Sequence, residues 1–273
     1  MEVTVICAGV GWVPSMVAVS LIGAALIAYV WAALTGAVTV YAPYISEAGA
    51  SPPQSGVFSL LLYFGSLLAC ATMLVRYVVV RNLNRCCQRM VDVLNVASLT
   101  VGLVAVFGNL IVSAYPVLTS RAIHNAGAYT MFLAAVLYMT LETGLTCCLC
   151  PEYYAKRMVW LRFSLTAMSV VGVIFTACYQ YVGDNLWSEG LSDKPKHLRE
   201  PGDPGFRELL ISAMGEWFLV TVFLAFFLTF AYEFRRVIVT VDLFPLVCHM
   251  DEHIEVTRLR PHDSYSLFSS ASL

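Results

Sequence analysis

Charged residues are scarce in this sequence. Only 12% of its 273 residues are Asp, Glu, Lys or Arg, whereas 59% are hydrophobic and the mean hydropathy is +0.75. Soluble domains carry about a quarter charged residues, because their surfaces must be solvated. This chain has too few polar side chains to cover a water-facing surface, which excludes an ordinary soluble protein. The net charge of −2, with no basic face, also gives no basis for nucleic-acid binding.

The motifs of the common catalytic and cofactor sites are also absent. The sequence contains no GxSxG, HExxH, Walker A or dinucleotide-binding pattern, and no His/Asp cluster with metal-ligand spacing. Cys147 and Cys150 have CxxC spacing, but no second close pair and no nearby His accompanies them, which disfavours zinc. We therefore expect neither an enzyme nor a bound cofactor or metal.

Six long apolar segments dominate the chain instead. A helix needs about 20 mostly apolar residues to cross a bilayer, and near-continuous apolar runs favour helices over the alternating pattern of a membrane barrel. The sequence predicts an all-α membrane bundle of six helices with short loops over residues 1–240, and a flexible cytosolic tail over 241–273. The predicted helices are residues 13–40, 57–80, 93–115, 122–149, 162–182 and 208–232.

Basic residues are distributed unequally between the two sides of this predicted bundle. One side carries eleven Lys or Arg residues and the other carries five. Because Lys and Arg are enriched in cytosolic loops, both termini are predicted to be cytosolic. The eleven are Arg76, Arg81, Arg85, Arg89, Lys156, Arg157, Arg162, Arg235, Arg236, Arg258 and Arg260, and the five are Arg121, Lys194, Lys196, Arg199 and Arg207.

Several polar residues fall within or beside the predicted spans, where such residues are functional candidates. Glu142 and Arg76 lie at a similar depth toward the cytosolic side, so a structural ion pair explains them as well as a functional role does. Glu216 has no obvious basic partner, and we expect it to be protonated or to bond Asn109 or a backbone carbonyl. His124, near the outer surface, could sense acidic pH, although an interfacial His is more often solvated or hydrogen-bonded.

Cysteines are absent from the predicted outer loops, which gives no disulfide framework on that side. Five of the nine cysteines cluster instead at the predicted cytosolic boundary of the membrane. Juxtamembrane cysteines are substrates for reversible palmitoylation, so the cluster is a candidate acylation site. Its members are Cys86, Cys87, Cys147, Cys148 and Cys150.

The predicted tail carries one short recognition pattern. Tyr265 and Phe268 have the spacing of a tyrosine-based sorting signal, in which adaptor proteins read an aromatic and a bulky apolar side chain in two pockets. A four-residue match also arises by chance, and chance is the competing explanation.

Four stretches of the sequence resemble one family. They are PYISEAGASPPQSG at 43–56, ATM with a following RY at 71–77, HNAG at 124–127, and GEW with a following FLTF and EF at 215–234. Together they resemble the damage-regulated autophagy modulators, the DRAM family, within the wider Frag/DRAM/Sfk group of membrane proteins. The resemblance covers almost the whole chain. One departure is GNLI at 108–111, where family members often have GNFQ.

The resemblance implies a six-helix protein of the lysosomal or late endosomal membrane that promotes autophagy and, in some members, cell death. It also marks Glu216 and Trp217 as the family's Glu-Trp pair. Expected partners are the bilayer, sorting adaptors and autophagy-related proteins. Two other classes stay open: a channel or transporter in which Glu142 and Glu216 line a path, and a plasma-membrane scaffold that holds a phosphoinositide kinase through residues 81–89 and the tail. The loop at 43–56 either binds a partner or forms a tight outer cap.

Overall fold

The computed structural model describes residues 3–190 and 194–243, which form two units. The larger unit, residues 8–238, is a bundle of six long helices. The smaller unit holds the chain ends, where β1 (Val3–Ala8) and β2 (Ile238–Leu243) pair in a two-stranded sheet. The predicted all-α fold does not include this sheet. Its signal is present, because both segments are six residues long and rich in β-branched Val, Ile and Thr.

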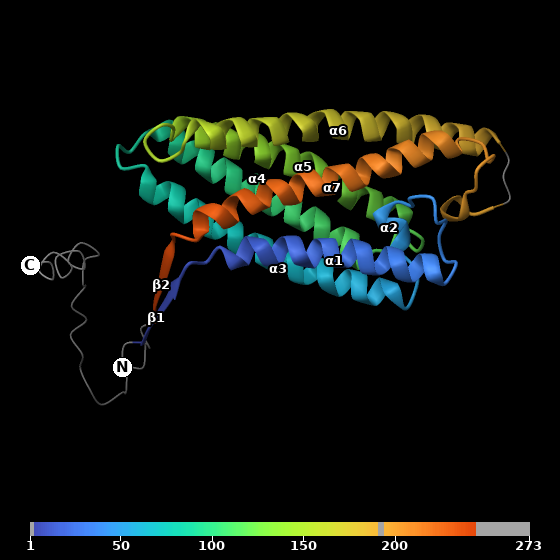
Figure 1. The fold of residues 1–273 in the computed structure, drawn as a ribbon, viewed down its shortest axis with the longest axis horizontal. Helices are drawn as coiled ribbons and strands as arrows, with labels where there is room; N and C mark the ends of the chain where they lie inside the picture. The colour runs from blue at the N-terminus through green and yellow to red at the C-terminus, as the bar shows by residue number, and fades with distance from the viewer. Residues whose placement is uncertain (1–2, 191–193, 244–273) are drawn as a thin grey trace, which may run out of the picture. The chain divides into compact units, whose positions relative to one another are not determined.

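Six helices of the larger unit are long and apolar enough to cross a membrane, which confirms the predicted fold class. They are α1 (Trp12–Leu34), α3 (Gln54–Leu83), α4 (Arg89–Ala114), α5 (Arg121–Cys148), α6 (Lys156–Glu189) and α7 (Phe206–Phe234). Two short elements lie between them: α2 (Ile45–Ala48) and the 3₁₀ helix η1 (Lys196–Leu198). Figure 1 shows α7 passing between α6 and α1.

Two of the predicted helices differ clearly from the structure in where they begin or end. α1 ends at Leu34 and not at residue 40, because Gly36 adopts a positive φ of 69° that terminates the helix. α6 extends well beyond the predicted 162–182, to Lys156 at one end and Glu189 at the other. Hydropathy marks only the apolar part of a helix, whereas Lys, Arg and Glu continue it readily into water.

Small residues set the closest approach between helices. Cβ atoms added at Gly108 of α4 and Gly127 of α5 would come within 3.0 Å of the facing helix's backbone. Close backbone approach of this kind is typical of membrane helices, which pack without a hydrophobic driving force between them. The outward faces carry large apolar side chains such as Phe163, Val171 and Ile174, each more than half exposed, as expected of a surface covered by lipid.

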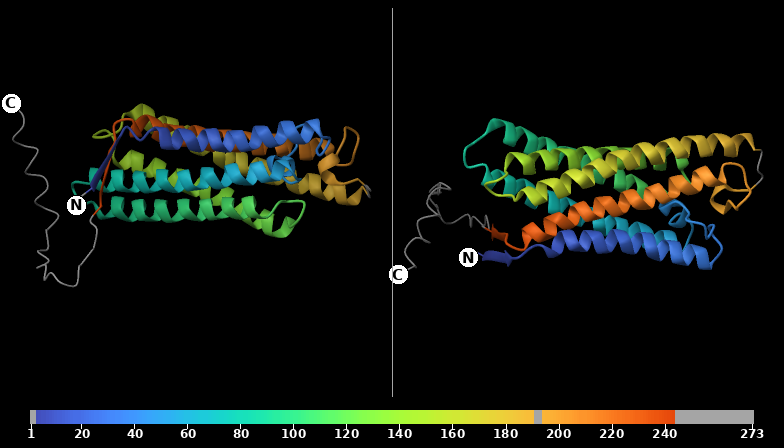
Figure 2. Two further views of the ribbon diagram at one scale, coloured as in Figure 1. Left: turned by 90° about the horizontal axis from the view of Figure 1, so that it is seen from below. Right: turned by 45° about the horizontal axis from the view of Figure 1, so that its top comes forward.

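Each of the six long helices runs in the opposite direction to the one before it, so the connections lie at two ends of the bundle (Figure 2). We call the end where α1 begins and α7 ends the terminal end, and the other the loop end. The terminal end also carries the α3–α4 and α5–α6 connections, and the loop end carries the other three. The predicted cytosolic face is the terminal end, and this orientation stays a prediction.

Candidate functional site

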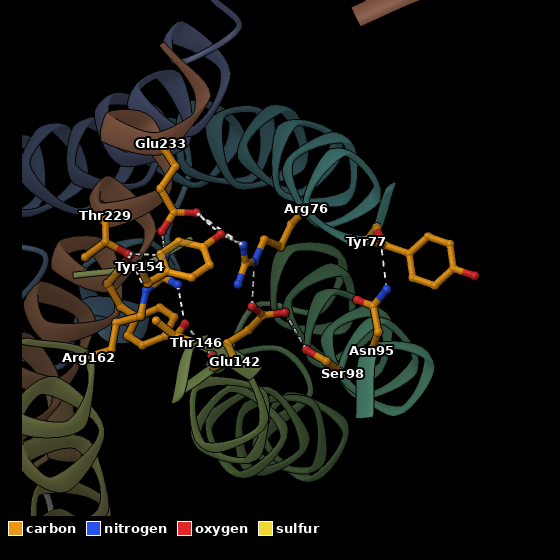
Figure 3. A network of polar contacts seen from close by, with 11 residues as sticks. Arg76, Tyr77, Asn95, Ser98, Glu142, Thr146, Tyr154, Arg162, Thr229 and Glu233 are labelled. Atoms are coloured by element: carbon orange, nitrogen blue, oxygen red, sulfur yellow. Dashed lines mark hydrogen bonds and ion pairs between the residues drawn. The ribbon is translucent and has the colours of Figure 1, made fainter. Parts of the chain in front are cut away.

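A network of buried charged groups lies near the terminal end of the bundle (Figure 3). It consists of Arg76 on α3, Glu142 on α5, Tyr154 in the α5–α6 connection, Arg162 on α6 and Glu233 on α7. We call these five residues the ion-pair network. The two arginines and Glu142 are at most 2% exposed. Two positive and two negative side chains therefore balance each other inside the bundle.

Arg76 binds both carboxylates of the network. Its Nε lies 2.8 Å from Oε2 of Glu142, and its Nη1 lies 3.2 Å from Oε2 of Glu233 and 2.5 Å from the Tyr154 hydroxyl oxygen. The other oxygen of Glu142 accepts a hydrogen bond from Ser98 of α4 at 2.7 Å. Burial raises the pKa of Tyr154, so its hydroxyl stays protonated and donates to Glu233 at 3.3 Å. The pair predicted between Arg76 and Glu142 is present.

Arg162 binds the oxygen of Glu233 that Arg76 does not bind. Its Nη2 lies 2.5 Å from Oε1 of Glu233, and its remaining donors bind the hydroxyl groups of Thr146 and Thr229 at 2.6 to 3.0 Å. The guanidinium also lies 4.7 Å from the ring centroid of Phe230, a cation–π distance. With Ser98 included, the network joins α3, α4, α5, α6 and α7. This connectivity is suited to fixing the relative positions of the helices.

Two members of the network, Arg76 and Arg162, are among the basic residues that predict the orientation of the bundle. Both are buried, as is Tyr154. Arg162 and Glu233 were not recognised as intramembrane partners, because each lies at the edge of an apolar run, where a charged residue normally points to water.

At the loop end, the segment before α3 is bound to α7 by two side chains. Oε2 of Glu216 accepts a hydrogen bond from the backbone N–H of Ile45 at 3.0 Å, and the indole Nε1 of Trp217 donates to the backbone carbonyl of Pro43 at 3.0 Å. The bond expected between Glu216 and Asn109 is not made, because the Asn109 amide donates to Ser66 at 2.8 Å. The Glu-Trp pair thus fastens the segment that carries the sequence PYI.

A buried ion pair fixes the same segment to the α6–α7 connection. Nη1 of Arg199 lies 2.8 Å from Oε2 of Glu47, and both side chains are at most 6% exposed. The Arg199 guanidinium also lies 5.2 Å from the ring centroid of Tyr44, and burial raises the pKa of that tyrosine. These contacts favour the cap over the partner-binding explanation for the loop at 43–56. We call residues 43–49 and 196–199 the cap.

A cavity of about 270 Å³ lies beneath the cap, between α5, α6 and α7. Its walls include polar groups at the cap side, among them Glu216, Asp184 and Lys196, and apolar side chains deeper in the bundle. We call it the polar cavity. His124 also lines it, and its Nδ1 lies 2.7 Å from the backbone carbonyl of Tyr115. A satisfied, buried His fits the hydrogen-bonded explanation given above.

The two glutamates predicted as channel residues lie in separate layers. Glu216 lines the polar cavity, whereas Glu142 belongs to the ion-pair network. Along α7, Glu216 and Glu233 are seventeen residues apart, or about 25 Å at 1.5 Å per residue. A mostly apolar cavity of about 110 Å³, lined by residues such as Phe223 and Phe227, lies between the layers. This arrangement gives no support to a continuous polar path.

The cysteine cluster lies at the terminal end, as expected from the sequence. Cys86, Cys87, Cys147 and Cys148 are exposed, and Cys150 is half-buried. Exposure at a helix end makes these thiols accessible, and their acylation stays a prediction. Among the described residues, no group of three or more His, Cys, Asp or Glu side chains has the arrangement of a metal site. The candidate sorting signal, Tyr265 and Phe268, lies outside the described residues.

Comparison with known proteins gives a consistent assignment. The chain is 31% identical to human "DNA damage-regulated autophagy modulator protein 1" over 232 residues, which cover 84% of this chain and 92% of that protein. It is 29% identical to the bovine "DNA damage-regulated autophagy modulator protein 2" over 86% of the chain and 87% of that protein. A Xenopus laevis "Modulator of macroautophagy TMEM150B-B" is 33% identical over 49% of the chain and 57% of that protein.

No solved structure matches the chain significantly. Residues 9–237, which include every helix described above, match the domain family described as the "Frag1/DRAM/Sfk1/Cwh43P N-terminal domain". The match spans the ion-pair network, the cap and the polar cavity. The chain therefore belongs to the Frag1/DRAM/Sfk1/Cwh43P family.

Proposed function

We propose that this chain is a non-enzymatic, multi-pass membrane protein that promotes autophagy. One observation carries the proposal: nearly the full length of the chain aligns with proteins named as DNA damage-regulated autophagy modulators, at 31% identity for the human modulator 1. The residues that fasten the cap, Glu216 and Trp217, belong to the sequence stretches in which the resemblance to that family was found. The stretches that carry the resemblance thus include both side chains that bind the cap.

Autophagic flux tests the proposal directly. Cells that lack the chain are compared with the same cells re-expressing it, and turnover of a lipidated autophagosome marker is measured with and without a lysosomal inhibitor. Re-expression is expected to raise flux. The control is Arg76→Met, which disrupts the ion-pair network. This variant should restore less flux, and the reduction should match its lower amount of folded protein. Equal flux in all cells would contradict the proposal.

We further propose residence in the lysosomal or late endosomal membrane, with both helix-bundle termini in the cytosol. The family resemblance and the candidate signal at Tyr265 and Phe268 support this location, and the excess of basic residues at the terminal end supports the orientation. The test compares the tagged chain with its Tyr265→Ala form, with Ser266→Ala as the spacer control. Loss of lysosomal residence only in Tyr265→Ala is expected. Plasma-membrane residence of all three forms would contradict it.

Protease or antibody access to a C-terminal tag, after selective permeabilisation of the plasma membrane, tests orientation separately. A cytosolic terminal end predicts that the tag is accessible while lysosomes remain sealed. This result does not depend on which organelle holds the protein, so location and orientation fail independently.

A further inference from the structure

The polar cavity contains a carboxylate that the fold uses only in part. Oε2 of Glu216 accepts the bond from Ile45, but no described residue donates a hydrogen bond to Oε1. No basic side chain of the described chain lies within ion-pair distance of this carboxylate either. The side chain is nevertheless half-buried and lines the cavity, so a molecule that enters can reach it.

The other charges around the cavity are already matched or lie at its rim. Glu47 is paired with Arg199 at 2.8 Å, and Asp184 is paired with Lys196. Arg121, in the first turn of α5, is exposed and lines the mouth of the cavity. Glu216 is therefore the carboxyl group of the cavity lining that has no ion-pair partner among the described residues, and Arg121 lines the same cavity from an exposed position.

Unpartnered hydroxyl groups border the same space. Tyr44 and Thr176 both line the cavity, and the oxygen of each is buried without a hydrogen bond of normal geometry to the described residues. Buried polar atoms are usually hydrogen-bonded, because leaving one without a partner is unfavourable. Tyr44 and Glu216 thus bring two oxygen acceptors to the same cavity, whereas the Thr176 hydroxyl faces Gly215 of α7.

The deeper walls of the cavity are apolar and open to the side of the bundle. Phe132, Val173 and Leu219 line it from three different helices. Tyr129 and Leu133, also lining residues, are 52% and 60% exposed on the outer face of α5. In a membrane-spanning bundle, that face meets lipid, so the cavity opens toward the bilayer. Its 270 Å³ is close to the lower end of small-molecule sites.

We propose that the polar cavity binds an amphiphile whose head carries an ammonium group, with the ammonium against Glu216 and the hydrocarbon chain leaving between α5 and α6. An ammonium donates three hydrogen bonds and accepts none, which complements the Glu216 carboxylate oxygen and the Tyr44 hydroxyl oxygen. The charge pair is favourable because cavity and bilayer exclude most water. Two sources share this chemistry: a free long-chain amine, and a phospholipid head in which Arg121 would contact the phosphate.

The site is independent of the proposed role in autophagy, and its test uses purified full-length chain in lipid nanodiscs. The probe is a photoreactive, clickable hexadecylamine, and the control is the matching hexadecanoic acid, which has the same chain and an opposite head. The amine is expected to label α5 or α6 at residues that line the cavity, as mapped by mass spectrometry. Labelling of the same positions by both probes with equal efficiency would overturn the proposal.

Two variants with matched controls locate the site. Glu216→Gln keeps an oxygen that can accept from Ile45 but removes the negative charge, and it should lower amine labelling about tenfold, whereas Glu208→Gln should not. Ala177→Trp on α6 fills the cavity from an exposed position, whereas Ala167→Trp, exposed on the same helix, lies outside it. Unchanged labelling in Glu216→Gln, with folding verified by size-exclusion chromatography, would overturn the assignment.

Competition separates the two sources of the ammonium. If lysophosphatidylethanolamine displaces the probe better than unlabelled hexadecylamine does, the ligand is a phospholipid head, and Arg121→Gln should remove that advantage. If hexadecylamine is the better competitor, the ligand is a free amine. Either result supports an ammonium site, and failure of both competitors to displace the probe contradicts it.

Discussion

Charged side chains are buried at both ends of the bundle, and the two groups differ in how completely they are paired. In the ion-pair network, Arg76 and Arg162 face Glu142 and Glu233, and hydroxyl groups take up most of the remaining bonding capacity. At the loop end, the cap contains a matched pair as well, but Glu216 beside it has no basic side chain of the described residues within ion-pair distance. A balanced set joins helices, whereas an unbalanced one beside a cavity is available to a ligand.

Energetics support this division. Taking a charge out of water costs several kcal/mol, and only close opposite charges with further hydrogen bonds offset that cost. The ion-pair network meets this condition across five helices, except at Nη2 of Arg76, which is buried without a hydrogen-bond partner. Glu216 meets it only in part, through one hydrogen bond from a backbone N–H. An incompletely bonded buried carboxyl group is typical of a ligand-binding site.

The largest effect is expected from breaking the ion-pair network at Arg76. Arg76→Met leaves Glu142 buried with only Ser98 as a donor, so unfolding free energy should fall by about 3–5 kcal/mol. Thermal unfolding in detergent micelles measures the loss. Arg81→Met, at an exposed position on the same helix, is the control. Glu142→Gln added to Arg76→Met should recover part of the loss, and equal melting temperatures for Arg76→Met and Arg81→Met would contradict the network's structural role.

The second-largest loss of stability is expected from changing the packing of the cap against α3. A Cβ at Gly49 would lie 2.4 Å from ring carbons of Phe58, so Gly49→Ala forces the cap or the ring to move. Overpacking of this kind costs about 1–3 kcal/mol. Gly56→Ala is the matched control, since its added Cβ meets nothing within 4 Å. If both alanine variants unfold at the same temperature, the cap is not held against Phe58.

The sequence predicted the fold more fully than the sites, for physical reasons. Bilayer thickness imposes about 20 apolar residues on every spanning helix, so six spans can be counted directly. The sequence also predicted the ion pair of Arg76 and Glu142, because both residues lie inside apolar segments at a similar depth in the membrane. Partners at the ends of runs, such as Arg162 and Glu233, look the same as ordinary loop charges.

Contacts between distant segments could not be predicted at all. Glu47 and Arg199 are 152 residues apart, and no periodicity or spacing rule links the first connection to the last. The role of Glu216 as an acceptor for Ile45 depends equally on how α7 meets the cap. Glu216 and Ile45 both lie in stretches that carry the family resemblance, but only the folded structure shows that they are in contact.

A smaller effect is expected when the cap loses one hydrogen bond to α7. Trp217→Phe keeps an aromatic ring beside Tyr29 but removes the donor to the buried carbonyl of Pro43, which should cost about 1 kcal/mol. The control is Trp160→Phe, because Trp160 is 67% exposed. Differential scanning fluorimetry should show a lower melting temperature for Trp217→Phe alone. Protection of the cap amides from hydrogen exchange should fall in the same variant, and unchanged protection would mean that the indole does not hold the cap.

The smallest effect is a pH dependence that belongs to the cap and not to the ion-pair network. Partial burial lowers the pKa of His197 in η1 below its usual 6.5. The unfolded chain therefore binds a proton more readily than the folded one, so this residue costs stability as pH falls from about 7 through 6.5 and below. His197→Gln should be less sensitive than the unmodified chain when melting temperatures at pH 7.5 and pH 5.5 are compared. Because its side chain is part-exposed and its backbone carbonyl already accepts from Thr39, the substitution should leave stability at pH 7.5 nearly unchanged. Identical sensitivity in both proteins would place any acid response elsewhere in the bundle.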